Sequence, residues 1–312
     1  MNILEINELN VTFSTPIGNV FAVNNASFTI NNNETLALVG ETGCGKSVIA
    51  NTIMGLLPQN AKVSGEIIYK GTNILKMNEK ELEKIRQQEI SIVFQNPSLS
   101  LNPLHTVGDQ ISEPLIIHKK MDKQKAAHKA KQLLKTMGFQ NPSKSSKMYP
   151  YQLSGGMNQR VLLSISMTLN PSIIIADEPT KGLDHELIRD ILEEFNTVKR
   201  INKSSILLIT HDFSVAKELS DRIAIMYSGD IVEIGKTKDF FKKSLHPYSK
   251  ILLNSLPELG FHPPKGSSPS MINIPSGCKF HPRCPYKKKI CTEITPPLFS
   301  FDKRKVRCYL FQ

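Results

Sequence analysis

Residues Thr35–Ser47 read TLALVGETGCGKS and carry the clearest signal in this chain of 312 residues. The first five form a short apolar run, the next eight follow the pattern G-x-x-x-x-G-K-S, and VIANTIMGLL after them has helical character. A strand, a glycine-rich loop and a helix in this order bind nucleotide phosphates, because backbone N–H groups turn inward and the helix N-terminus adds its positive dipole end. We therefore predict an α/β fold with a phosphate-binding loop.

The residues of this loop are the first candidate site. Lys46 is expected to reach the β- and γ-phosphates of a nucleotide, and Ser47 to bind Mg²⁺. Cys44 is expected to contribute its backbone more than its sulfur. The candidate nucleotide-binding residues are Gly40, Glu41, Thr42, Gly43, Cys44, Gly45, Lys46, Ser47 and Val48.

Polar side chains follow three further apolar strands. SIIIADEP ends in Asp177 and Glu178, where a carboxylate is needed for the Mg²⁺ shell and a second could orient the attacking water. SSILLIT is followed by His211, which would face the γ-phosphate, although a histidine at a strand end is more often structural. Gln95 follows ISIVF and could reach the metal or the water. We predict Glu178, His211 and Gln95 as catalytic, and Ser47, Gln95 and Asp177 as Mg²⁺ ligands.

A second phosphate-binding helix start is predicted in YQLSGGMNQRVLLSISM. Ser154 is a good N-cap, and Gly155 and Gly156 allow a phosphate to approach the helix closely. Two such helices are redundant in one site but useful if ATP lies between two subunits. The segment Leu153–Met157 resembles the signature motif of ATP-binding-cassette (ABC) ATPases.

This resemblance covers most of the chain, and its motifs occur in the family's order. It implies a P-loop NTPase with a RecA-like core, an antiparallel β subdomain and an α-helical subdomain, acting as a head-to-tail dimer. Asp184 then lies in the D-loop, where Lys181-Gly182 replaces the usual small residues. An aromatic residue near the first strand would stack on adenine; we select Phe13, with Phe21 as the alternative.

Three segments resemble the D-type ATPase of oligopeptide, dipeptide and nickel importers: VFQNPSLSLNPLHTVGDQI, the N-terminal TPIGNVFAVNNASFTI with GETGCGKSVIA, and LHPYSKILLNSLPE. Membership implies ATP and Mg²⁺ as cofactors, and two transmembrane permease subunits and a second, paralogous ABC ATPase as partners. An extracytoplasmic binding protein would supply the substrate. The chain would lie peripherally on the cytoplasmic face of a prokaryotic membrane.

Composition favours three divisions of the chain. Residues 1–257 form the cassette, with the helical subdomain at about 97–165; residues 258–275, rich in Pro, Gly and Ser, form a linker. Residues 276–312 form a small cysteine-rich metal module. From Cys278 onward this tail carries nine Lys/Arg and two Asp/Glu, so it contributes 9 − 2 = +7 of the chain's net charge of +11. We interpret these charges as a solvated face of a tail that has no core of its own.

Four of the five cysteines, Cys278, Cys284, Cys291 and Cys308, lie in this tail. Their spacing is compatible with zinc, also through Cys278-x2-His281, or with an iron–sulfur cluster, and free thiols remain an alternative. Disulfides are disfavoured because no secretory signal or membrane-spanning run indicates an oxidising compartment. The resemblance favours a [4Fe–4S] cluster bound by the four cysteines, with zinc as the alternative.

Two other functions compete with the importer subunit. One is a soluble ABC ATPase of the DNA-repair or translation type, but the chain has no tandem cassette or coiled-coil insertion. The other is a metal- or redox-sensing nucleotide switch. Nucleic-acid binding itself is disfavoured because most of the excess positive charge belongs to the cysteine-rich tail.

Overall fold

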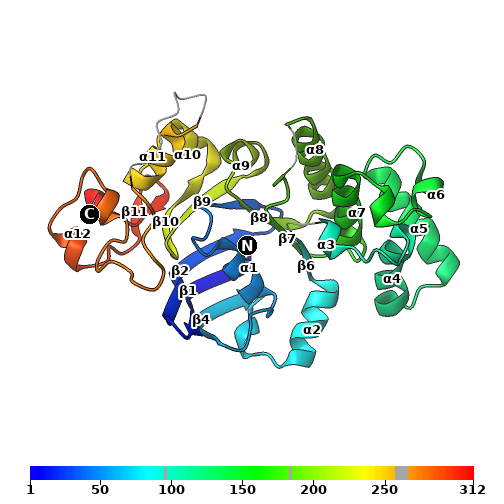
Figure 1. The fold of residues 1–312 in the computed structure, drawn as a ribbon, viewed down its shortest axis with the longest axis horizontal. Coiled ribbons are helices and arrows are strands. Elements are labelled where there is room, and N and C mark those ends of the chain that lie inside the picture. The colour runs from blue at the N-terminus through cyan, green and yellow to red at the C-terminus, as the bar shows by residue number, and fades with distance from the viewer. Residues whose placement is uncertain (95–96, 183–184, 257–265) are drawn as a thin grey trace. The chain divides into compact units, whose positions relative to one another are not determined.

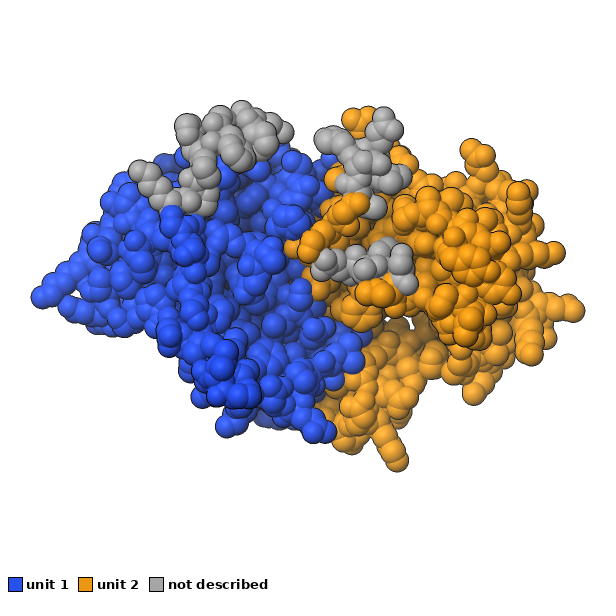
Figure 2. Space-filling view, in the orientation of Figure 1, with its two compact units in different colours: residues 1–76, 209–312 blue, residues 77–208 orange. Residues whose placement is uncertain are grey.

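The computed structural model describes residues 1–94, 97–182, 185–256 and 266–312. These residues form two compact units: the first joins Met1–Lys76 with Ile209–Gln312, and the second comprises Met77–Leu208. Figure 1 shows the fold as a ribbon, and Figure 2 distinguishes the two units by colour. The second unit is thus inserted, in sequence, into the first.

An antiparallel sheet in the first unit has the strand order β2-β1-β4-β5. Its strands are β1 (Asn2–Thr15), β2 (Gly18–Asn31), β4 (Ala61–Tyr69) and β5 (Thr72–Asn73). The second half of β2 buries every other residue, Ala26, Phe28 and Ile30, which is the pattern of a strand with one covered face.

The phosphate-binding loop follows a strand of a second sheet in this unit. This sheet contains β3 (Thr35–Val39), β9 (Arg222–Tyr227), β10 (Asp230–Lys236), β11 (Phe299–Phe301) and β12 (Arg304–Val306). β3 runs parallel to β9, and the pairs β9–β10, β10–β12 and β12–β11 are antiparallel. All five residues of β3 are buried, as expected for an apolar parallel strand. The helices of this unit are α1 (Lys46–Ile53), α9 (Phe213–Leu219), α10 (Thr237–Lys242), α11 (Pro247–Asn254) and α12 (Ile290–Glu293).

The second unit combines parallel strands with most of the longer helices. β6 (Ile90–Val93) pairs in parallel with β7 (Ile173–Asp177), and β8 (Ser205–Thr210) is the next strand beside β7 and crosses the boundary into the first unit. The helices are α2 (Glu79–Gln88), α3 (Pro97–Ser100), α4 (Val107–Lys119), α5 (Lys123–Thr136), α6 (Pro142–Ser145), α7 (Gly155–Met167) and α8 (His185–Asn202). Helices α3 to α7 occupy the stretch in which the helical subdomain is predicted.

The structure corrects the prediction that the tail lacks a core and that all of its basic residues are solvated. Strands β11 and β12 extend the sheet at β10, and Lys279, Arg304 and Arg307 are buried along with Phe280. The ammonium group of Lys279 lies 3.1 Å from a carboxylate oxygen of Asp230 and donates to the carbonyl of Ser228 at 3.0 Å. The tail therefore shares the core of the first unit, and part of its positive charge attaches it there. No helix in the described part of the chain is long and apolar enough to cross a membrane.

Candidate functional site

The phosphate-binding loop is shaped by two close backbone approaches. Gly45 precedes α1 with a φ of 107°, and a Cβ there would lie 2.1 Å from the carbonyl oxygen of Ala22 on β2. A Cβ on Gly40 would lie 2.2 Å from the carbonyl oxygen of Met226 on β9. Only glycine fits these two positions, so the glycines of the motif are required by packing as well as by loop conformation.

Lys46, the first residue of α1, is held within this loop. Its side chain is buried, and its ammonium group donates to the carbonyl oxygens of Gly40 at 2.7 Å and Glu41 at 3.1 Å. The neighbouring Cys44 is also buried, and burial raises the pKa of its thiol. A buried, protonated thiol is a poor nucleophile, which agrees with a role for the Cys44 backbone rather than its sulfur.

His211 lies in the same unit, directly after β8. Its side chain is exposed, and the next residue, Asp212, caps α9 by accepting hydrogen bonds from the backbone N–H groups of Ser214 at 2.7 Å and Val215 at 3.3 Å. The cap fixes the chain direction at the end of the strand. His211 is thereby presented at the surface of the unit that carries the loop.

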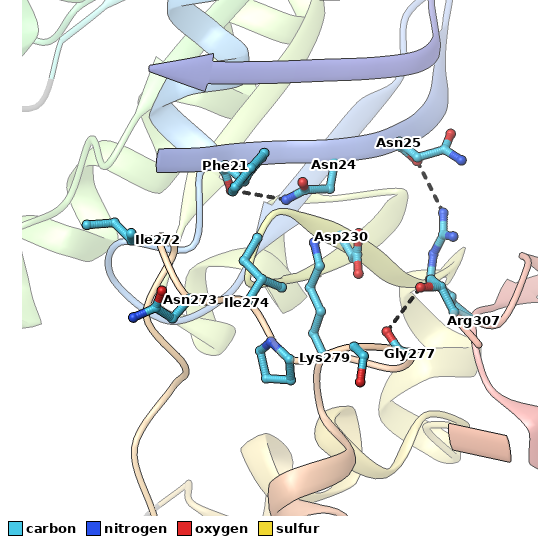
Figure 3. A pocket seen from close by; sticks show the side chains of 13 residues that line it. Phe21, Asn24, Asn25, Asp230, Ile272, Asn273, Ile274, Gly277, Lys279 and Arg307 are labelled. Carbon is cyan, nitrogen blue, oxygen red and sulfur yellow. Dashed lines mark hydrogen bonds and ion pairs between the residues drawn. The ribbon is translucent and has the colours of Figure 1, made fainter. Parts of the chain in front are cut away.

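The two candidates for stacking on adenine lie in different surroundings. Phe21 on β2 is partly exposed and lines a cavity of about 780 Å³ whose other wall is residues 272–277 (Figure 3). Phe13 on β1 is half-buried, pairs with Val20 and Ala61 in the antiparallel sheet, and is not among the residues lining this cavity. The choice of Phe13 stays a prediction.

The second unit carries the candidate carboxylates. Asp177 is the last residue of β7, and both Asp177 and Glu178 are buried. Glu178 has a φ of 50°, a left-handed conformation that is uncommon for a residue other than glycine. Such strained residues cluster at functional sites because the surrounding structure must hold them there.

The predicted signature segment begins α7 in the same unit. The hydroxyl of Ser154 accepts a hydrogen bond from the backbone N–H of Met157 at 3.3 Å, which confirms Ser154 as the N-cap. Ser154 and Gly155 are exposed, and a Cβ on Gly155 would have no heavy atom within 4 Å. The start of this 13-residue helix is therefore open to an anionic group. Gln95 and Asp184, predicted to reach the same nucleotide, lie outside the described residues.

A groove of about 390 Å³ lies among α2, α4 and α7 of the second unit. Arg86 and Gln87 on α2, His118 on α4 and Leu169 after α7 contribute to its lining. On nearby segments in sequence, Leu99 and Leu104 are 84% and 82% exposed. Exposed apolar side chains of this kind are typical of surfaces that bind a protein partner.

All four tail cysteines line one small, enclosed cavity of about 10 Å³. Burial raises the pKa of Cys278 to about 12 and also raises the pKa of Cys284 and Cys308, and the neighbouring cysteines add to each shift. Across the described residues, no group of three or more His, Cys, Asp or Glu side chains is arranged to hold a metal ion. The four thiols thus line one space, but they are not arranged as the ligands of a single metal ion.

One functional contact was not predicted from the sequence. Arg283, next to Cys284, forms an ion pair with Glu41 of the phosphate-binding loop, and Tyr248 accepts a hydrogen bond from the Glu41 backbone N–H. The sequence did contain one indication of this contact: Glu41 places a carboxylate in a loop that binds anions, and a nearby cation would stabilise that charge.

Comparisons with known proteins agree with this fold and these motifs. Residues 23–181 match the family model for ABC transporters, and residues 232–291 match the model for the oligopeptide/dipeptide transporter C-terminal region. The chain is 42% identical to the dipeptide transport ATP-binding protein DppD of Bacillus subtilis, over 99% of this chain and 94% of that protein. It is 41% identical to the oligopeptide transport ATP-binding protein OppD of Salmonella typhimurium, over 98% of this chain and 92% of that protein.

Solved structures support the same class. A dimeric post-hydrolysis state of the ATP-binding cassette MJ0796 with ADP and Pi aligns with a TM-score of 0.67 and 27% identity, covering 75% of this chain and 98% of that one. cbiO1 from Clostridium perfringens, part of an ABC transporter complex, aligns with a TM-score of 0.68 and 26% identity, covering 83% and 97%. The fold is that of a P-loop ABC ATPase. The chain belongs to the ABC transporter family, and it carries the C-terminal region of the oligopeptide/dipeptide transporters.

Proposed function

We propose that this chain is the ATP-binding and ATP-hydrolysing subunit of a binding-protein-dependent importer of oligopeptides or dipeptides. The observation that carries this proposal is the phosphate-binding loop with Lys46 at its centre, in a chain similar along nearly its whole length to dipeptide and oligopeptide transport ATP-binding proteins. The same similarity disfavours a soluble DNA-repair or translation ATPase and a metal- or redox-sensing switch. The resemblance also implies nickel or another metal chelate as the alternative cargo.

In this function the loop Gly40–Val48 cradles the phosphates of ATP. Bound Mg²⁺ neutralises charge on the β- and γ-phosphates, and the side chains present, Ser47 with Asp177 and Gln95, are oxygen donors suited to it. Glu178 polarises the attacking water and His211 contacts the γ-phosphate. An aromatic ring, Phe13 or Phe21, stacks on the adenine.

The signature segment completes the site of a second ATPase subunit. Ser154, Gly155 and Gly156 offer an open helix start to the γ-phosphate of an ATP bound by that subunit. The open space in front of Gly155 supports this role. Asp184, which the resemblance assigns to the D-loop, would contribute to the same site. We infer a paralogous ATPase as the second subunit.

Two permease subunits are the membrane partners in this proposal. The groove among α2, α4 and α7 has a mixed polar and apolar lining, and Leu99 and Leu104 are exposed on segments nearby in sequence. Such a groove suits an amphipathic helix presented by a permease. The chain then lies on the cytoplasmic face of the membrane. It meets the extracytoplasmic binding protein only through the permease.

The finer proposal for the tail is a [4Fe–4S] cluster bound by Cys278, Cys284, Cys291 and Cys308. Four thiols around one enclosed space fit a cluster that takes four thiolates, and zinc is the alternative. The cavity, about 10 Å³, has room for about one water, so binding a cluster requires the four thiols to move apart. Such a cluster would act here as a structural crosslink.

Metal analysis tests this part. The chain purified without oxygen is expected to contain about four iron and four acid-labile sulfide per polypeptide, as the cluster formula requires. About one zinc per polypeptide with no sulfide would show that the four cysteines bind zinc instead of a cluster. Absence of all three would leave free thiols as the correct interpretation.

Reconstitution tests the function itself. The chain, purified with its permease and second ATPase subunits in lipid vesicles, is expected to hydrolyse ATP faster when the binding protein carries a peptide and to accumulate that peptide. If a nickel chelate rather than a peptide stimulates ATP hydrolysis, the chelate is the cargo. ATP hydrolysis that is indifferent to permease and binding protein would contradict the importer assignment.

A further inference from the structure

The negative charge of Glu41 opposes the binding of a nucleotide by its own loop. It is the second residue of the phosphate-binding motif, and its carboxylate adds negative charge where a highly charged triphosphate must bind. Two like charges a few ångströms apart repel each other strongly at a partly dehydrated site. A nearby cation that holds this carboxylate would remove most of that penalty.

Arg283 of the tail supplies this cation. Its two terminal nitrogens, Nη1 and Nη2, each lie 3.3 Å from Oε1 of Glu41, and Nη1 lies 3.4 Å from Oε2. The Arg283 side chain is 7% exposed and that of Glu41 is 26% exposed, so solvent screens the pair less than it screens a surface pair. Ser268 also donates a hydrogen bond to Glu41.

An aromatic cluster fixes Arg283 in this position. Its guanidinium group lies 5.7 Å from the ring centre of Tyr227 and 5.8 Å from that of Phe280, and it donates to the Tyr227 hydroxyl at 3.3 Å. The rings of Tyr227, Tyr248 and Phe280 lie within 4.5 to 5.4 Å of one another. Because these rings are buried, the guanidinium has little freedom to leave the carboxylate.

The pair continues into the phosphate-binding residues through the Glu41 backbone. The backbone N–H of Glu41 donates to the hydroxyl of Tyr248 at 3.3 Å, and the carbonyl oxygen of Glu41 accepts from the Lys46 ammonium at 3.1 Å. Arg283 therefore fixes the side chain of a residue whose backbone contacts Lys46. No other residue in the described tail is seen to form an ion pair with this loop.

We propose that Arg283 is a positioning residue for nucleotide binding: it neutralises Glu41 and fixes it to the tail, so that the C-terminal region sets the affinity of the phosphate-binding loop. This inference rests on the proposed function, namely that the loop binds ATP. The tail then influences nucleotide binding through the positive charge of Arg283.

Calorimetric titration of the full chain with MgATP tests the proposal. Arg283→Met is expected to raise Kd about three- to tenfold, because it leaves the Glu41 charge uncompensated beside the phosphates. Adding Glu41→Gln to Arg283→Met is expected to restore most of the lost affinity, since the repelling charge is then gone. The matched control is Lys289→Gln, which removes one exposed positive charge from the same tail and should leave Kd within about twofold.

The double variant decides between charge compensation and a merely structural role. If Arg283→Met/Glu41→Gln binds as weakly as Arg283→Met, or if Arg283→Met binds like the unmodified chain, the proposal is wrong. Should Arg283→Met fail to fold, Arg283→Gln serves instead, since it also removes the charge but keeps a polar side chain; it must weaken MgATP binding, and Glu41→Gln must again reverse the loss. An unmodified chain that binds no MgATP would overturn the proposed function rather than this inference.

Discussion

At the scale of single residues, Glu178 combines burial with a left-handed backbone conformation, which agrees with its predicted role; ten other described non-glycine residues also have a positive φ. A left-handed conformation outside glycine costs about 1–3 kcal/mol and persists only where the surroundings enforce it. The sequence could predict the carboxylate at the end of an apolar strand, but not its dihedral angle. Backbone strain depends on the contacts around the turn, and these are not local in sequence.

Replacing Glu178 with Gln is expected to leave MgATP binding intact and to lower the steady-state ATPase rate of the assembled importer about 100-fold or more. The amide has the same shape but cannot act as a base or hold a negative charge next to the water. Binding is measured by titration and turnover by phosphate release. Lys46→Ala is the contrasting variant, because it should weaken binding itself; an unchanged rate for Glu178→Gln would end its assignment.

At the scale of helices and strands, the local elements of the nucleotide site were predictable. β3 coincides with the apolar run Thr35–Val39, and β7 ends at Asp177 as SIIIADEP indicates. Both follow from short apolar runs that stop at polar residues. The pairing of β12 with β10 was not predictable, because it joins segments about 70 residues apart in sequence through a short strand of mostly basic residues.

Helices α7 and α8 are joined by a charge cluster whose one buried member, Glu194, makes stability depend on pH. Arg160 on α7 lies 2.6 Å from Glu194 and 2.9 Å from Asp190, both on α8. Burial raises the pKa of Glu194 from its ordinary value of 4.5 to about 8, although Arg160 opposes the shift. The folded protein therefore holds this proton more tightly than the unfolded chain does. The stability that protonated Glu194 contributes to the fold is complete below about pH 4.5 and is lost as the pH rises through about 8.

Glu194→Gln is expected to remove this pH dependence, because the amide does not titrate. Urea unfolding of both proteins between pH 6 and pH 9 should show the unmodified chain losing stability relative to the variant as the pH rises. All other charged groups are common to both proteins, so their contributions cancel in the comparison. Parallel curves for the two proteins would mean that Glu194 is already ionised at pH 6.

At the scale of the whole chain, the position of the tail's positive charge was predicted only in part. Five of its nine basic residues are exposed as expected: Lys287, Lys288, Lys289, Lys303 and Lys305. The excess of basic residues in the tail was predicted to be solvated, yet Lys279, Arg304 and Arg307 are buried in the first unit. Composition cannot distinguish a solvated cation from one that satisfies buried carbonyl oxygens, since the partners come from distant strands. Hydrogen bonds from buried basic side chains therefore attach the tail to the first unit, together with the pairing of β12 with β10.

Arg307 makes the clearest case for this attachment. It is 6% exposed, and its guanidinium donates to the carbonyl oxygens of Ile231 at 3.1 Å, Pro296 at 3.2 Å and Asn25 at 3.2 Å. The contact with Asn25 is visible in Figure 3. One side chain thus connects β2, β10 and the segment before β11.

Arg307→Met is expected to lower the free energy of unfolding by about 3 kcal/mol, because the buried carbonyl oxygens of Ile231 and Pro296 lose their donor at a cost of about 1–3 kcal/mol each. The carbonyl oxygen of Asn25 is only part-buried, so water can replace the guanidinium there. Lys305→Met is the matched control: Lys305 lies on β12, two residues before Arg307, but is exposed, so its loss should change the free energy by less than about 0.5 kcal/mol. Urea unfolding of the full chain measures both. Equal, small effects would show that water replaces the guanidinium at these carbonyls, and that the strand pairing of β12 with β10, rather than Arg307, holds the tail in the first unit.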